Sequence, residues 1–210
     1  LPSREEDEVR YLSVKYSMPE YLVEKWKAAY GVKTTEKILE DFLTERPITV
    51  RCRTHKASLK EIVTSLKAQG VTVQQAPYLP YALKISDYNH ILTLDAFLQG
   101  KILVQDISSM LVAEAASPKK GDYIIDMCAA PGGKSIHAAD KMGDYGNVDA
   151  RDVSQYKADL IKENIHRTGV INVDAKVQDA TVYDPDSEQA ADIVIADVPC
   201  SGYGVIGKKP

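Results

Sequence analysis

The chain has 210 residues, of which 44% are hydrophobic and 27% are charged, and its formal net charge is −4. This length suits one large domain or two small ones with a substantial core. No apolar run approaches the roughly 20 residues that cross a bilayer, and the acidic beginning of the chain lacks the pattern of a secretory signal. We therefore expect a cytoplasmic protein without membrane contact, in which nucleic acid can be bound only by local basic patches.

Two amphipathic helices are predicted in the first 46 residues. One follows Pro19, carries apolar residues at helical spacing and ends at Gly31. The other covers about Thr35 to Thr44 and ends before Pro47. Because this pair could not bury both of its apolar faces alone, residues 1–46 are expected to be a helical linker segment packed on something larger.

Residues 47–99 are expected to form a small β-α-β-β module. Apolar residues alternate from Ile48 onward, which predicts a strand with one face in the core and a basic face that carries Arg51 and Arg53. A capping box that begins at Ser58 opens a helix. Two further strands are predicted, near residues 71–75 and 82–85.

Strands and helices alternate from residue 100 to residue 210. Strands are predicted near residues 102–104, 123–127, 148, 173–177 and 192–196, with helices over residues 110–116, 135–142 and 156–167. This alternation predicts a Rossmann-like α/β domain, in which helices cover a parallel sheet and ligands bind at the carboxyl ends of the strands. The last strand would be an exposed apolar edge, so we expect a truncated sequence whose sheet is incomplete on its C-terminal side.

The segment Asp126–Ser135, Asp-Met-Cys-Ala-Ala-Pro-Gly-Gly-Lys-Ser, joins a predicted strand to a predicted helix. Gly132 and Gly133 permit close backbone approach, and the helix that they open presents unpaired N–H groups to a ligand. A P-loop would need a glycine in place of Cys128, and a dinucleotide fold would need G-x-G-x-x-G. S-adenosylmethionine is the third candidate ligand.

Two aspartates follow successive predicted strands. The adenosine of S-adenosylmethionine needs a carboxylate for its ribose after the second strand and polar partners for its base after the third, where Asp152 and Asp179 stand. Asp152 could instead cap a helix, and Asp179 could be a turn residue. Together, beside a glycine loop, they favour a shared ligand. Lys134 opposes the helix dipole, which indicates an anionic partner.

The three cysteines, Cys52, Cys128 and Cys200, lack the paired spacing of a zinc site or a disulfide framework, so we expect free thiols and no metal. Cys200 lies in Asp197-Val-Pro-Cys-Ser-Gly202, after the last predicted strand. Pro199 fixes the backbone there. Cys200 is a candidate nucleophile or acid–base thiol, or a small buried hydrophobe.

The segments Asp126–Ser135 and Asp197–Gly204, the latter Asp-Val-Pro-Cys-Ser-Gly-Tyr-Gly, together resemble the Sun/RsmB group of RNA 5-cytosine methyltransferases. The resemblance extends upstream through Lys15–Val23 and Gln105–Ser109, and so covers nearly the whole chain. It implies methylation of C5 of a cytosine in RNA, with S-adenosylmethionine as the cofactor and 16S ribosomal RNA of the small subunit as the substrate.

The resemblance also assigns residues. A cradle for the cofactor would be formed by seven consecutive residues, Cys128, Ala129, Ala130, Pro131, Gly132, Gly133 and Lys134. Asp152 would bind the ribose hydroxyls, Asp179 would lie by the adenine, and Asp197 would lie between the cofactor and the target base. Residues 47–99 would be the RNA-binding subdomain, with Arg51 and Arg53 as its phosphate-binding surface.

In such enzymes a cysteine thiolate adds to C6 of cytosine, C5 accepts the methyl group, a base removes the C5 proton, and the thiol leaves. The attacking cysteine stands in a Thr-Cys-Ser type segment that we expect beyond residue 210, and we expect the family's N-terminal NusB-like domain to lie outside this sequence as well. Cys200 matches the other family cysteine, which is associated with product release, so we assign it to the active site without calling it the nucleophile. Two alternatives remain: a catalytically incomplete module that binds cofactor and RNA, and an NAD-dependent oxidoreductase.

Overall fold

The computed structural model describes residues 1–44, 47–143 and 145–200. The chain divides into two compact units, one of Leu1–Arg46 with Pro199–Pro210 and the other of Pro47–Val198. None of the helices within the described ranges is long and apolar enough to cross a membrane.

The N-terminal part of the first unit contains three helices, α1 (Glu8–Tyr16), α2 (Glu20–Tyr30) and α3 (Val32–Phe42). The sequence predicted only α2 and α3, and α3 begins earlier than expected because Gly31 both ends α2 and precedes α3. The three helices share one apolar core, formed by Leu12, Tyr16, Met18, Leu22, Val23 and Leu39. The additional helix, α1, thus supplies apolar surface against which the predicted pair can pack.

The second unit begins with an antiparallel subdomain, residues 47–104. Its elements are β1 (Ile48–Cys52), α4 (Leu59–Ala68), β2 (Thr72–Gln75), β3 (Ala82–Ser86), a 3₁₀ turn (Ile91–Thr93), α5 (Asp95–Leu98) and β4 (Ile102–Val104). The strand order is β2-β3-β1-β4, and every neighbouring pair is antiparallel. The predicted capping box is present, because Ser58 and Glu61 bond each other's backbone N–H groups.

The expectation that residues 102–104 begin the parallel sheet is wrong. β4 pairs antiparallel with β1, with Cys52 opposite Ile102 and Val50 opposite Val104. Three apolar residues in a row predict a buried strand but carry no information about the strand beside it or its direction. The antiparallel subdomain therefore extends past residue 99, and the parallel fold begins after residue 104.

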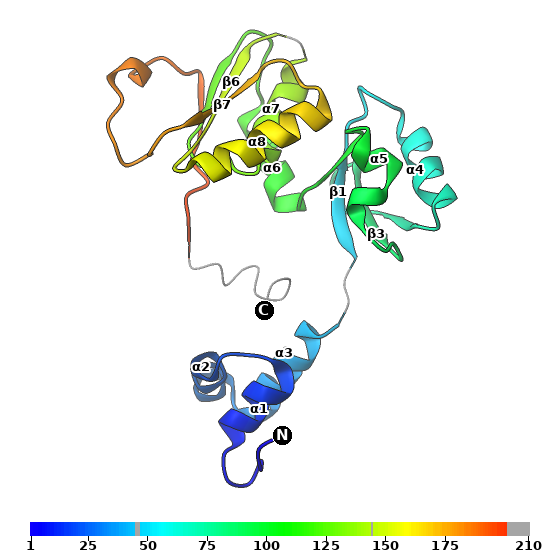
Figure 1. Ribbon diagram of the computed structural model, residues 1–210, viewed down its shortest axis with the longest axis vertical. Coiled ribbons are helices and arrows are strands. Elements are labelled where there is room, and N and C mark those ends of the chain that lie inside the picture. Colours follow the sequence, from blue (N-terminus) through cyan, green and yellow to red (C-terminus); the bar gives the residue numbers. More distant parts are fainter. Residues whose placement is uncertain (45–46, 144, 201–210) are drawn as a thin grey trace. The chain divides into compact units, whose positions relative to one another are not determined.

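The parallel subdomain, residues 105–198, has the predicted α/β fold. Its elements are α6 (Ile107–Ala116), β5 (Tyr123–Asp126), α7 (Gly133–Met142), β6 (Asn147–Asp152), α8 (Gln155–Thr168), β7 (Val173–Val177), a 3₁₀ turn (Pro185–Ser187) and β8 (Ile193–Ile195). The strand order is β7-β6-β5-β8, with all pairs parallel. In Figure 1, α7 and α8 cover one side of this sheet, and residues 178–191, drawn in orange, extend from the opposite side.

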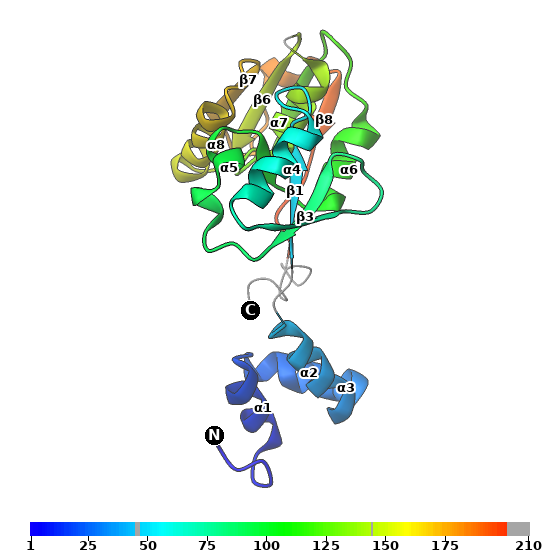
Figure 2. The same cartoon turned by 90° about the vertical axis from the view of Figure 1, so that its right-hand side faces the viewer.

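The core of the parallel subdomain lies between the sheet and its helices. It contains ten buried residues, Ile124, Ala129, Ala138, Ala139, Met142, Val148, Ala150, Ile161, Val173 and Ile195. From β5 the chain builds β6 and β7 on one side, then returns to place β8 on the other side of β5 (Figure 2). This reversal at β5 is the position where open α/β sheets bind ligands, at the carboxyl ends of the strands.

Candidate functional site

Each strand of the parallel sheet is followed or ended by an aspartate at its carboxyl end. Asp126 and Asp152 are the last residues of β5 and β6, Asp179 comes shortly after β7, and Asp197 comes shortly after β8. Because all four strands run in the same direction, these aspartates share one edge of the sheet. We call this edge the acidic rim (Asp126, Asp152, Asp179 and Asp197).

The glycine loop, residues 128–134, connects β5 to α7 at this rim. Gly132 has a φ of +97°, and a Cβ at this position would stand 3.2 Å from Cγ2 of Ile161, so a side chain would be strained here. The loop is fastened to the neighbouring strand because the N–H of Ala129 donates to the carbonyl of Arg151 over 2.8 Å. The first N–H groups of α7 thus face the end of the sheet, where they suit an anionic or polar group.

Asp152 holds the loop in place. Its Oδ2 accepts from the N–H of Ala130 over 3.0 Å, and its Oδ1 accepts from the N–H of Val153 over 2.8 Å and from Lys157 Nζ over 3.0 Å. Burial would raise the pKa of Asp152, but these hydrogen bonds outweigh it and lower the pKa. The N-cap of α8 is Ser154, so Asp152 does not serve as the helix cap.

Lys134 has the anionic partner that its place at the start of α7 indicated. Its Nζ lies 2.5 Å from Oδ2 of Asp197. The pair joins the glycine loop to the end of β8, so three strand ends are linked at the rim. A lysine that is paired with a carboxylate differs from the lysine of a P-loop, which must reach a phosphate.

Asp126, which was not predicted as a site residue from the sequence, is a buried carboxyl beneath the glycine loop. It is fully buried, and its Oδ2 accepts from Ser135 Oγ over 2.7 Å. Burial raises the pKa of this carboxyl to about 6, against the effect of the Ser135 hydrogen bond. The available signal was an acid at the end of an apolar strand, since such a residue must find a hydrogen-bond partner when it is buried.

Cys128 and its neighbours form the glycine loop, and the Cys128 thiol is not activated as a nucleophile. Burial, followed by the nearby carboxylates of Asp152 and Asp126, raises the pKa of the Cys128 thiol, so this residue stays protonated. Ala129 is buried in the core, and the carbonyl of Pro131 accepts from Asn164 Nδ2 over 2.9 Å. These contacts fix the shape of the cradle.

Asp179 has the contacts of a turn residue. Its Oδ1 accepts from the N–H of Thr181 over 2.9 Å and from Thr181 Oγ1 over 2.7 Å. It also lines a cavity of about 310 Å³, with Ile125 and Val194 among the other lining residues, on the sheet face away from α7 and α8. No other predicted site residue lines this cavity. The placement of Asp179 beside an adenine stays a prediction.

Cys200 is exposed and belongs to the other compact unit. Ser201, Gly202, Tyr203 and Gly204 of its motif lie outside the described residues. Its assignment to the active site therefore also stays a prediction. Within the described ranges, no group of three or more His, Cys, Asp or Glu side chains could hold a metal ion.

The prediction that Arg51 and Arg53 form an exposed phosphate-binding surface is wrong. Both residues are only 2% exposed, and both bond Asp140 on α7. The alternation of β1 correctly predicted two different faces, but the basic face is covered by the parallel subdomain (Figure 1). A buried guanidinium that already bonds a carboxylate is not available to RNA.

Two family models match most of the chain. The model of the 16S rRNA methyltransferase RsmB/F matches residues 113–210, and the model of the ferredoxin-like domain of RsmF/B-like methyltransferases matches residues 18–91. The chain belongs to the RsmB/F methyltransferase family. The glycine loop and the rim residues Asp126, Asp152, Asp179 and Asp197 all lie in the part that matches the RsmB/F model.

Individual relatives agree with this family. The chain is 38% identical over 206 residues to the probable ribosomal RNA small subunit methyltransferase B of Bacillus subtilis, with 98% of this chain and 46% of that protein covered. It is 31% identical to the human 28S rRNA (cytosine(4447)-C(5))-methyltransferase, over 95% of this chain and 25% of that one. The crystal structure of PH0851 superposes with a TM-score of 0.83 at 34% identity, covering 97% of this chain and 46% of that chain. The chain thus spans less than half the length of these relatives.

Proposed function

We propose that this chain belongs to an enzyme that methylates C5 of a cytosine in ribosomal RNA in the cytoplasm, with S-adenosylmethionine as the methyl donor and 16S RNA of the small subunit as the substrate. The observation that carries the proposal is the bond between the Ala130 N–H and Asp152, which fastens the glycine loop to the neighbouring strand end. The names of the bacterial and human relatives support the reaction and the RNA class.

The residues of the rim fit this cofactor. S-adenosylmethionine carries a cationic sulfonium and two ribose hydroxyls, and an edge that carries the carboxylates of Asp152, Asp179 and Asp197 suits a cation and hydroxyl donors better than it suits a phosphate chain. The only cation at the start of α7, Lys134, is paired with Asp197. When it is bound, this cofactor supplies an electrophilic methyl group.

Each part of the site has a proposed task. The glycine loop, from Cys128 to Lys134, would cradle the cofactor with its N–H groups. Asp152 is ionised and buried, and its three donors leave about one lone-pair site, on Oδ2, that could accept from a ribose hydroxyl while the residue holds the loop. Asp179 would lie by the adenine. Asp197 would lie between the cofactor and the target base, with Lys134 fixing its carboxylate.

The chemistry on the base needs an enzyme thiolate. In the proposed reaction a cysteine thiolate adds to C6, C5 takes the methyl group, a base removes the C5 proton, and elimination of the thiolate restores the ring. The target cytosine must leave its stack to enter the site. We assign Cys200 to product release. The raised pKa of the Cys128 thiol makes that residue a poor competitor for the attack.

A second candidate is a module that binds cofactor and RNA without turnover. It is favoured by the raised pKa of the Cys128 thiol, which keeps the cysteine of the glycine loop from acting as an attacking thiolate. The test incubates the chain with tritiated S-adenosylmethionine and small-subunit ribosomal RNA. Labelled 5-methylcytosine supports the enzyme, whereas cofactor binding in calorimetry without label supports the module. Tighter binding of NAD than of S-adenosylmethionine in a parallel titration would refute both.

A further inference from the structure

A buried cluster of charged side chains joins the two subdomains. Asp140 of α7 accepts at Oδ2 from Arg51 Nη1 over 2.6 Å, and its two oxygens accept from Arg53 Nη2 over 2.6 Å and from Arg53 Nε over 2.9 Å. The three side chains are 2%, 1% and 6% exposed for Arg51, Arg53 and Asp140. We call these residues the arginine–aspartate cluster. One carboxylate of α7 therefore accepts from two guanidinium groups, that of Arg51 on β1 and that of Arg53 directly after this strand.

The cluster reaches the glycine loop through Gln105. Arg51 Nε donates to Gln105 Oε1 over 2.8 Å, and this glutamine is itself buried. Its Cδ lies 3.8 Å from the point where a Cβ on Gly133 would stand. Gly133 is the first residue of α7. Arg51 thus contacts both Asp140 in the second half of α7 and a side chain that packs against the start of the same helix.

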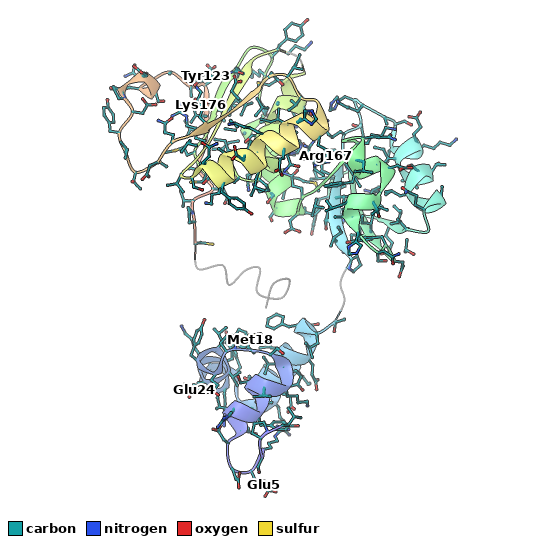
Figure 3. The ribbon with its side chains drawn as sticks, in the orientation of Figure 1. Glu5, Met18, Glu24, Tyr123, Arg167 and Lys176 are labelled. Atoms are coloured by element: carbon teal, nitrogen blue, oxygen red, sulfur yellow. The ribbon has the colours of Figure 1, made fainter. Side chains whose placement is uncertain are left out.

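Residues just after β1 contact α8, the second helix beside the proposed cofactor site. Arg53 Nη1 donates to the carbonyl of Thr168 over 2.6 Å, and Lys56 Nζ donates to the same carbonyl over 2.6 Å. Thr168 is the last residue of α8, the helix that begins just after Asp152. Arg167, labelled in Figure 3 at this end of α8, donates to the carbonyl of Phe97 in the antiparallel subdomain over 2.8 Å.

We propose that Arg51, Arg53 and Asp140 are positioning residues for the cofactor. They fix α7 and α8 against β1 and the residue that follows it, and so set the distance between the glycine loop and Asp152, which lie at the other ends of these helices. The inference rests on the proposed function, because it assigns the cluster a role in cofactor binding. In this proposal the antiparallel subdomain supports cofactor binding through buried arginines, in place of the exposed RNA-binding arginines that the sequence predicted.

The choice of charged residues supports a role in geometry. Well-packed apolar side chains of similar volume often stabilise a fold as much as a buried ion pair does, because the pair loses hydration. A planar guanidinium that donates two bonds to one carboxylate, in contrast, fixes the direction of approach. An apolar contact would let α7 turn or slide, and the loop would move with it.

The decisive variant replaces the cluster by apolar residues, Arg51→Met, Arg53→Met and Asp140→Leu together. We expect its thermal unfolding midpoint to fall by less than that of the control below, because the three charges are removed together although Gln105 and the Thr168 carbonyl each lose a donor. Its dissociation constant for S-adenosylmethionine in calorimetry should rise at least tenfold. The control is Leu66→Ala, a buried core change in the antiparallel subdomain that should lower the midpoint and leave the affinity unchanged. If affinity merely follows stability in both variants, the positioning role is wrong.

Hydrogen exchange gives a second readout that does not depend on the cofactor. In the triple variant the backbone amides of residues 136–139, which are hydrogen bonded within α7 from the Ile136 N–H onward, should exchange at least tenfold faster, while those of α4 keep the parent rate. A parent chain that binds no S-adenosylmethionine overturns the proposed function, yet the exchange rates still test the cluster. Parent-like exchange in the triple variant would overturn the positioning role.

Discussion

Two ion pairs on the same helix differ in their surroundings. At the start of α7, Lys134 pairs with Asp197, whose side chain is 59% exposed. In the second half of the helix, Asp140 pairs with two arginines, and its side chain is 6% exposed. Both pairs join α7 to another element. Water and a ligand can replace a partner in the first pair, whereas the second pair has no replacement for a lost charge.

This difference separates the tasks of the two ends of the helix. The rim presents groups that can exchange a protein partner for a ligand, as a binding site must. The contacts of α7 and α8 with the antiparallel subdomain, made by Asp140 and by the end of α8, are buried and keep one arrangement. We call this contact region the junction. Four predictions test this contrast. The first two concern the contacts between α7, α8 and the antiparallel subdomain, the third concerns the rim, and the fourth compares a residue from each place.

The largest effect is expected at the buried pair. Asp140→Ala leaves two buried guanidinium groups without their carboxylate, so we expect it to lower the free energy of unfolding by about 3–5 kcal/mol. Asp197→Ala removes an exposed partner and should cost less than about 1 kcal/mol. Urea unfolding of both variants measures the two values. Equal losses would mean that burial does not distinguish the pairs.

The close approach at the junction gives the second prediction. Gly100 has a φ of +62°, and a Cβ there would stand 2.5 Å from the carbonyl oxygen of Arg167. Gly100→Ala should therefore cost about 2–3 kcal/mol, from backbone strain and the displacement of α8. Gly121→Ala is the matched control, since Gly121 also has a positive φ but open space around its Cα. The account expects a cost of about 1 kcal/mol there, and a similar cost at both glycines would argue against tight packing at residue 100.

At the rim, Asp152→Ala should weaken the binding of S-adenosylmethionine by about 1–3 kcal/mol, because the ribose hydroxyls lose a charged acceptor and the loop loses its anchor. Asp159→Ala on the exposed side of α8 is the control and should leave the affinity unchanged. Calorimetry compares the two variants with the parent chain. An unchanged affinity in Asp152→Ala would remove this residue from the site.

The smallest effects are pH dependences of opposite sign. Burial and the charge of Arg51 lower the pKa of His137 to about 3 from 6.5, so the unfolded chain binds a proton below pH 6.5 that the folded chain refuses, and stability falls as the pH drops. Burial raises the pKa of Asp126 to about 6 from 3.8, so the folded chain gains relative stability as the pH drops from 6 to 3.8.

Single variants separate these two contributions. His137→Gln should make the loss of stability between pH 6.5 and pH 5 shallower by about 1.4 kcal/mol per pH unit, and Asp126→Asn should make the loss between pH 6 and pH 4 steeper by a similar amount. His166→Gln, at an exposed position of α8, serves as the control. Urea unfolding at several pH values measures the slopes, and slopes that change in the same direction in both variants would contradict the assignment.

The rim was predictable from the sequence because its signals are local. A strand-forming run, a glycine pair and a helix at fixed spacing define the loop, and the direction of parallel strands brings Asp152, Asp179 and Asp197 to the same edge. The partner of Lys134 was also indicated by its unfavourable place at a helix start. Each of these inferences needs only the chain order of neighbouring elements.

The junction was not predictable in the same way. The alternation of β1 shows that Arg51 and Arg53 share a face, but solvent and another subdomain are equally compatible with a polar face in the sequence. Asp140 would have been the signal, since a buried acid needs a cationic or hydrogen-bonding partner, but nothing in the mixed sequence of α7 shows that this residue is buried. That partner lies far away along the chain, and only the fold brings the two together.

A crystal structure of the chain with S-adenosylhomocysteine, the product form of the cofactor, tests the central claim most directly. The account predicts that the ribose hydroxyls lie within hydrogen-bonding distance of the Asp152 carboxylate, and that the glycine loop from Cys128 to Lys134 surrounds the amino-acid end. Density for the ligand on the opposite sheet face, in the cavity lined by Ile125 and Val194, with the rim free of ligand, would contradict it.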